Sequence, residues 1–91
     1  MDATPAEPER ATGEEARLDT ALGAEVRAIR ARRGWSQEVL AEKTGYNKKT
    51  IARLERGERA MTIAQMYKIC RAFDIRPSDL LGAAEKEAGI Q

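Results

Sequence analysis

Three positively charged side chains cluster at the start of one short predicted helix. Lys48, Lys49 and Arg53 fall on one face of this helix. Ile51 and Leu54 fall on the opposite face, where they would pack into a core. Lysine and arginine donate hydrogen bonds to guanine O6 and N7 in the major groove of DNA, which is wide enough to admit a helix. We therefore predict that Lys48, Lys49 and Arg53 contact the bases of double-stranded DNA.

This helix is expected to be the second of two short helices that are joined by a tight turn. Ser36 is a favourable N-terminal cap for the first helix, and Gly45 lies in the turn, where a left-handed conformation is needed. Asn47 caps the second helix, which spans about residues 48–56 and stops at Gly57. A turn this short holds its helices at a steep angle, the helix-turn-helix arrangement, and leaves the start of the second helix exposed.

Three further helices are predicted around this pair, and no segment reads as a strand. Asp19 or Thr20 is expected to start the first, and Trp35 to pack between the first and second. Thr62 is expected to cap the fourth helix, and Pro77 fits the first turn of the fifth. The apolar residues that recur at helical spacing are Leu18, Leu22, Val26, Ile29, Ile63, Met66, Ile69, Cys70, Phe73, Leu80 and Leu81. The prediction is a compact, all-α domain of five helices.

The sequence divides into a tail, a domain and a short end. Residues 1–17 contain no large apolar residue after the initial methionine, and they include Pro5 and Pro8. Such a segment cannot bury enough surface to offset its ordering entropy, so we expect a disordered acidic tail. Residues 18–85 are expected to form the helix-turn-helix domain, and residues 86–91 to be a frayed C-terminus.

Charge is distributed unevenly along the chain. The formal net charge is only +1, and residues 1–19 hold six acidic and two basic side chains. Residues 20–60 hold ten basic and five acidic side chains, so positive charge is concentrated around the predicted motif. The length of 91 residues suffices for one small domain and leaves no room for a large effector-binding domain.

The residue types argue against several other classes of protein. Cys70 is the only cysteine, so no intramolecular disulfide forms, and the absence of histidine removes the commonest metal ligand and general base. No catalytic residues, metal site or cofactor are therefore expected, and the chain is predicted not to be an enzyme. No apolar run approaches the ~20 residues of a membrane span, and no signal segment opens the chain. The expected location is the cytoplasm, in association with the nucleoid.

Several blocks of the sequence, in the right order, resemble the phage repressor/Cro (XRE-type) helix-turn-helix family. Residues 30–41, RARRGWSQEVLA, are similar to the family's R-x-x-x-G-x-S-Q-E-x-L-A opening. Residues 50–58, TIARLERGE, are similar to its recognition helix and exit. Residues 66–73 and 77–81 are similar to its fourth helix and its closing segment. The resemblance implies a five-helix, lambda repressor-like fold and a homodimer formed through the C-terminal helices.

The resemblance also implies roles for residues around the predicted base contacts. Gln37 would bond to a phosphate and brace the recognition helix. Arg30 and Glu55 would form a structural ion pair between the first and third helices. The residues expected to contact DNA phosphates are Gln37, Thr50, Tyr46, Asn47 and Arg56.

The predicted function is that of a sequence-specific transcriptional regulator that binds double-stranded DNA. Two copies would place their recognition helices in successive major grooves about 34 Å apart, so the operator should be an inverted repeat. One alternative is an adapter or antitoxin-type module that uses the same fold to bind another protein. A second alternative is the DNA-binding fragment of a longer regulator.

Overall fold

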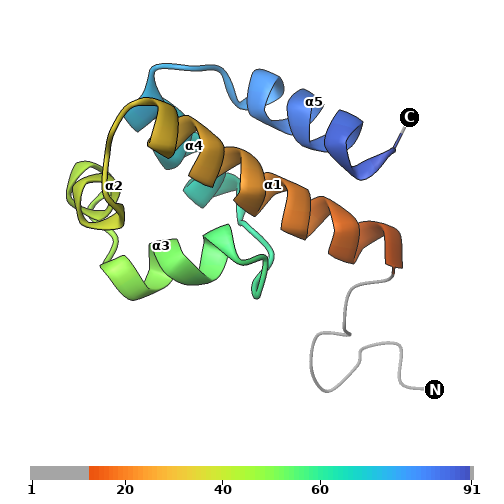
Figure 1. The fold of residues 1–91 in the computed structure, drawn as a ribbon, viewed down its shortest axis with the longest axis horizontal. Helices are drawn as coiled ribbons and strands as arrows, with labels where there is room; N and C mark the ends of the chain where they lie inside the picture. The colour runs from red at the N-terminus through yellow and green to blue at the C-terminus, as the bar shows by residue number, and fades with distance from the viewer. Residues whose placement is uncertain (1–12, 91) are drawn as a thin grey trace.

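The computed structural model describes residues 13–90, which fold into five α-helices (Figure 1). They are α1 (Gly13–Arg32), α2 (Gln37–Thr44), α3 (Lys48–Glu55), α4 (Ile63–Phe73) and α5 (Pro77–Ala88). No strand occurs among these residues, and the predicted all-α, five-helix fold is confirmed. No helix in the described part is long and apolar enough to cross a membrane.

Side-chain caps start the middle three helices as predicted. The side chains of Ser36, Asn47 and Thr62 each accept a hydrogen bond from the backbone N–H three residues later. Such a cap satisfies a donor that the helix itself leaves unpaired. Gly45 ends α2 in the left-handed region, at φ 82°, and Pro77 is the first residue of α5.

The first helix is longer at its N-terminus than the sequence indicated. It begins at Gly13, whereas Asp19 or Thr20 was the expected start. Residues 13–17, assigned above to the disordered tail, are therefore helical, and this part of the prediction is wrong. The remainder of the predicted tail, residues 1–12, lies outside the described residues.

The start of α1 and the end of α5 lie beside each other. Arg17 Nε donates a hydrogen bond to the carbonyl oxygen of Ala88 at 3.4 Å. Gly89 then closes α5 in the left-handed region at φ 74°, and its N–H bonds to carbonyls of the last turn. Residues 86–91 were predicted to be frayed; for residues 86–88, which are helical, this is wrong, and residue 91 lies outside the described residues.

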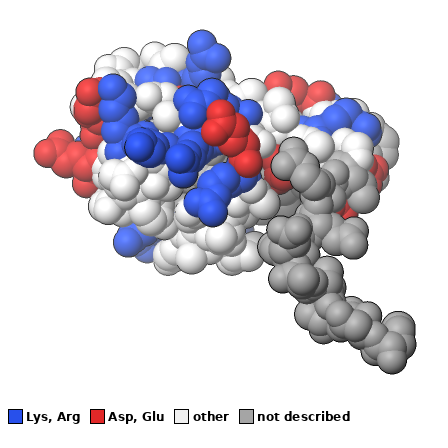
Figure 2. All heavy atoms as spheres, turned by 90° about the horizontal axis from the view of Figure 1, so that it is seen from below, with Lys and Arg blue, Asp and Glu red and all other residues white. Residues whose placement is uncertain are grey.

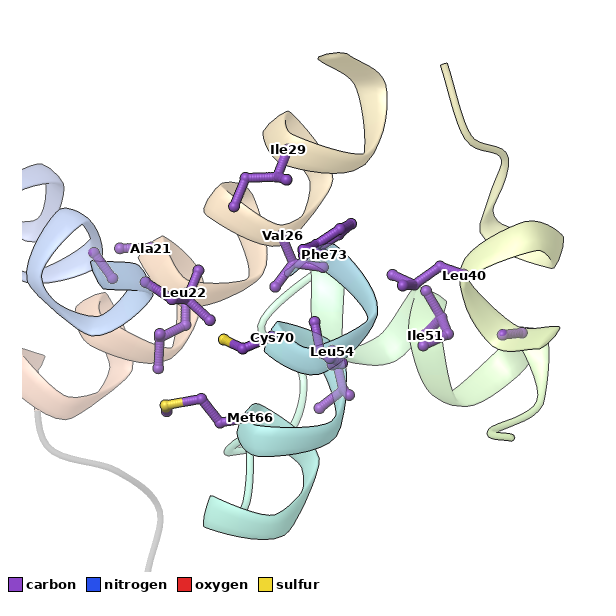
Figure 3. Packing of buried hydrophobic residues seen from close by; sticks show 14 residues of the cluster. Ala21, Leu22, Val26, Ile29, Leu40, Ile51, Leu54, Met66, Cys70 and Phe73 are labelled. Carbon is purple, nitrogen blue, oxygen red and sulfur yellow. The ribbon is translucent and has the colours of Figure 1, made fainter. Parts of the chain in front are cut away.

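The hydrophobic core lies where α1, α3 and α4 meet, with α2 and α5 closing its sides (Figure 3). Its buried members are Ala21, Leu22, Val26, Ile29, Leu40, Ala41, Ile51, Leu54, Met66, Ile69, Cys70, Phe73, Leu80 and Ala84. Leu18 and Leu81 are half-buried at its edge. Each apolar stripe therefore contributes to one continuous core, which sets the orientation of α3.

Ile63 is the exception among the predicted core residues. Its side chain is 81% exposed, so its assignment to the buried stripe of α4 is wrong. Ile63 is the first residue of α4, and the core begins one turn later, at Met66. Tyr67, one turn after Ile63 on the same side of α4, is also exposed. These are the large hydrophobic residues that the described part of the chain leaves in solvent.

Trp35 also packs against α4. The predicted packing between α1 and α2 did not include this contact. Its ring stacks on Phe73 with 5.5 Å between ring centroids. Lys43 of α2 places its Nζ 4.7 Å from the Trp35 ring centroid, and Arg33 donates to the carbonyl oxygen of Phe73 at 2.6 Å. Cations over an aromatic ring add to the packing. Trp35 therefore links the loop between α1 and α2 to the end of α4.

Candidate nucleic-acid interface

Helix α3 has one buried face and one charged, exposed face. Ile51 and Leu54 are buried, with 0% and 3% of their surface exposed. Lys48, Lys49 and Arg53 are exposed on the outer side. Figure 2 looks at the molecule from the side where α3 lies in Figure 1, and it shows lysine and arginine side chains gathered on this face. The core thus fixes α3 while its positive side chains remain exposed to solvent, where they can meet a polyanion.

The predicted phosphate-contacting residues lie at both ends of α3. Asn47 is exposed, and because its Oδ1 accepts from the backbone N–H of Thr50 at 2.8 Å, its amide NH2 remains as a donor. At the other end, Arg56 is exposed, and its Nε lies 2.5 Å from Glu58 Oε2. This hydrogen bond lowers the pKa of the Glu58 carboxyl. Arg56 must therefore share its guanidinium with Glu58 if it contacts a phosphate.

Tyr46 lies in the turn between α2 and α3. It is half-buried and packs against the edge of the core. Lys68 of α4 places its Nζ 5.4 Å from the centroid of the Tyr46 ring. The aromatic ring therefore anchors the turn, and the Lys68 ammonium places a positive charge beside it.

Glu55, the last residue of α3, joins three helices through its carboxylate. It is only 8% exposed. Arg30 of α1 forms a two-pronged ion pair with it, at 2.7 Å from Nε and 3.0 Å from Nη2, and this contact raises the pKa of the guanidinium. Gln37, the first residue of α2, donates from Nε2 to the same carboxylate at 2.9 Å. Bidentate, charge-assisted bonds of this kind fix direction as well as distance.

Gln37 therefore braces the last turn of α3, which is one of the two roles that the sequence resemblance implied, and its phosphate contact stays a prediction. The Gln37 Nε2 carries a second hydrogen that does not bond to Glu55 and remains available as a donor. Arg30 also donates from Nη1 to the carbonyl oxygen of Trp35 at 2.8 Å, just before the start of α2. The far end of α3 is consequently tied to both α1 and α2, and its orientation relative to them is fixed.

The sequence that forms this helix pair matches a known family model. The helix-turn-helix model HTH_3 matches residues 26–80, which include α2 and α3. The chain belongs to the helix-turn-helix family of transcriptional regulators. This helix-turn-helix regulator is 36% identical over 61 residues to the uncharacterized HTH-type transcriptional regulator YgzD of Bacillus subtilis. That match covers 67% of this chain and 92% of YgzD.

Solved structures of regulators have the same fold. The clp gene regulator ClgR from C. glutamicum superposes with a TM-score of 0.75 at 30% identity, covering 81% of this chain and 96% of ClgR. The restriction-modification controller protein C.AhdI from Aeromonas hydrophila gives a TM-score of 0.67 at 34% identity. That superposition covers 71% of this chain and 97% of C.AhdI. The resemblance inferred from the sequence blocks is thus confirmed.

Gly23 is a positioning residue of this regulator that the sequence did not reveal. A Cβ atom at Gly23 would lie 2.3 Å from the carbonyl oxygen of Leu54 and 2.5 Å from that of Glu55. The backbone of α1 therefore touches the last turn of α3 directly, which only glycine permits. A glycine in the middle of an amphipathic helix was the available signal, because glycine there is unfavourable without a packing reason.

A cleft opens between α1, the exposed side of α3 and the loop that follows it. Thr50, Arg53 and Arg59 line it together with Asp19 of α1. Burial, and secondarily the charge of Glu15, raises the pKa of the Asp19 carboxyl. The Arg53 side chain borders open space on the α1 side of α3. The sequence did not predict that Asp19 lies near Thr50 and Arg53, because α1 and α3 are not consecutive in the chain.

Proposed function

We propose that this helix-turn-helix regulator binds a specific sequence of double-stranded DNA, with α3 in the major groove. The observation that carries the proposal is the exposed basic face of Lys48, Lys49 and Arg53 on a helix whose other face is fixed in the core. These three residues would contact base edges. Phosphate contacts, which set the register without reading sequence, would come from Gln37, Thr50, Tyr46, Asn47 and Arg56.

The regulator is further proposed to act as a homodimer formed through its C-terminal helices. Within these helices we assign the contact to α4, because its Ile63 and Tyr67 are 81% and 54% exposed. Leu80 of α5 is buried within the monomer and unavailable for such a contact. A two-fold dimer would place two copies of α3 about one DNA turn apart and would require an inverted-repeat operator.

Selection from a pool of randomised duplexes, at one fixed near-physiological salt concentration, tests the proposal directly. We expect enrichment of an inverted repeat whose half-sites are centred about 34 Å apart. Weak enrichment, with salt-sensitive retention of every duplex, would show that the basic face binds phosphates without reading bases. That outcome would contradict the proposed function.

Arg53→Ala is expected to weaken binding to the selected operator by about 1–3 kcal/mol and to relax the preference at one base pair. The reason is that Arg53 would lose its donors to a single base edge. Titration of the operator and of single-base variants, followed by fluorescence anisotropy, measures both effects. Arg76→Ala serves as the control, because Arg76 is exposed at the start of α5 and makes no side-chain cap. An equal loss on all duplexes would show that Arg53 contacts phosphate.

Tyr67→Glu is expected to weaken the dimer at least tenfold without unfolding the monomer. A carboxylate would have to be buried in the apolar contact, whereas in the monomer the position is in solvent. Sedimentation equilibrium measures the association, and circular dichroism checks the helices. Ala83→Glu, at an exposed position of α5, is the matched control. If only Ala83→Glu disrupts the dimer, the interface lies on α5 and the assignment to α4 is wrong.

A further inference from the structure

One ion pair joins the starts of the two helices of the motif. Lys48, the first residue of α3, places its Nζ 3.3 Å from Oε2 of Glu38, the second residue of α2. The hydrogen bond from Lys48 lowers the pKa of the Glu38 carboxyl, so this group is charged throughout the neutral range. The side chains are 57% and 66% exposed. The pair therefore lies at the leading edge of the proposed DNA interface.

This pair distinguishes Lys48 from the other two proposed base-reading residues. Within the described part of the chain, neither Lys49 nor Arg53 forms an ion pair. A lysine is a flexible point charge, which on its own contacts any nearby phosphate as readily as a base. The Glu38 carboxylate, on the first turn of α2, attracts the Lys48 ammonium and so favours positions of the ammonium near α2.

The location of the pair indicates that its role concerns binding rather than folding. Ion pairs this exposed add little to the stability of a folded protein. When DNA covers the interface and displaces water, the same attraction becomes stronger. The carboxylate also repels any phosphate that approaches in the wrong register, and such repulsion is one source of specificity.

We propose that Glu38 is a positioning residue for DNA specificity, because its carboxylate directs the Lys48 ammonium toward one base and keeps phosphates away from it. This inference rests on the proposed function. Glu38 is acidic and does not itself attract DNA. By this inference it nevertheless helps to determine which base pair is read at the start of α3.

Glu38→Gln tests this inference in the full chain. Binding is measured on the selected operator, on the operator with the base pair opposite Lys48 changed, and on a duplex without an operator. We expect discrimination at that base pair to fall about fivefold or more, the lower range for one well-placed base contact. Binding to the duplex without an operator should become tighter, and its salt dependence steeper by about one phosphate contact. In a Lys48→Met background, Glu38→Gln should not change the base preference.

Glu42→Gln is the matched control for the loss of negative charge. Glu42 is an exposed carboxylate on the same helix and forms no ion pair with a described residue. It should strengthen binding to all duplexes alike and leave base preferences unchanged. If Glu38→Gln behaves in the same way, or keeps wild-type discrimination, the inference is overturned while the proposed function stands. If the wild-type protein selects no sequence, both fail together.

Discussion

Gly23→Ala is expected to destabilise the domain by about 3 kcal/mol or more, the upper range for overpacking a core. The new methyl group would meet two backbone carbonyl oxygens of α3, at 2.3 and 2.5 Å, and backbone cannot change rotamer to make room. Helix α1 must therefore shift away from α3. The loss is large against a total stability of about 5–10 kcal/mol for a domain of this size. Urea denaturation followed by circular dichroism measures it.

Gly82→Ala is the matched control for this prediction. Gly82 lies in α5 and is exposed, and a methyl group added there would have no neighbouring atom within 4 Å. Alanine there should stabilise the domain by up to about 1 kcal/mol through helix propensity alone. The same substitution is thus expected to have opposite signs at the two sites. A neutral result at Gly23 would mean that the contact between α1 and α3 yields at little cost.

Glu55→Ala is expected to lower the stability by about 3 kcal/mol, as is typical when one partner of a buried ion pair is removed. The guanidinium of Arg30 would remain largely buried without its counterion, and the amide of Gln37 would lose its acceptor. For a domain of under 100 residues this corresponds to a fall in Tm of roughly 12–24 °C. Differential scanning calorimetry measures the change.

Glu58→Ala provides the comparison, because it removes a glutamate carboxylate that pairs with an arginine on the surface. The pair of Glu58 with Arg56 is about half exposed on both sides, so its loss should leave Tm unchanged. Combining Arg30→Met with Glu55→Leu should restore much of the stability lost in Glu55→Ala, since no buried charge is then left without a partner. Equal Tm values for Glu55→Ala and Glu58→Ala would refute the structural role assigned to Glu55.

Most of the features that were predictable from the sequence depend on neighbouring residues alone. Ser36, Asn47 and Thr62 each supply an oxygen within reach of a backbone N–H three residues on, and this depends on nothing distant in the chain. The same holds for Gly45, whose left-handed conformation ends α2. The exposed basic face of α3 followed from helical periodicity. The pairing of Arg30 with Glu55 came from the family resemblance.

Features that depend on contacts between distant segments were not predictable in this way. The first turns of α1, which begins at Gly13, lie beside the end of α5, where Arg17 bonds to the carbonyl oxygen of Ala88. The exposure of Ile63 depends on how far the core extends along α4, and periodicity does not report that limit. The contact at Gly23 depends on the crossing of two helices that are not consecutive in the chain.

Because α3 is anchored at its far end, its positions are of two kinds, which differ in how much a substitution affects stability. Leu54 and Glu55 hold the helix, and their replacement endangers the fold. Lys48, Lys49 and Arg53 are exposed, and substitutions at such positions typically change stability by less than about 0.5 kcal/mol. The base-reading role proposed for these three residues would therefore let duplicated copies acquire different DNA preferences by changing them, while each copy remains folded at every step.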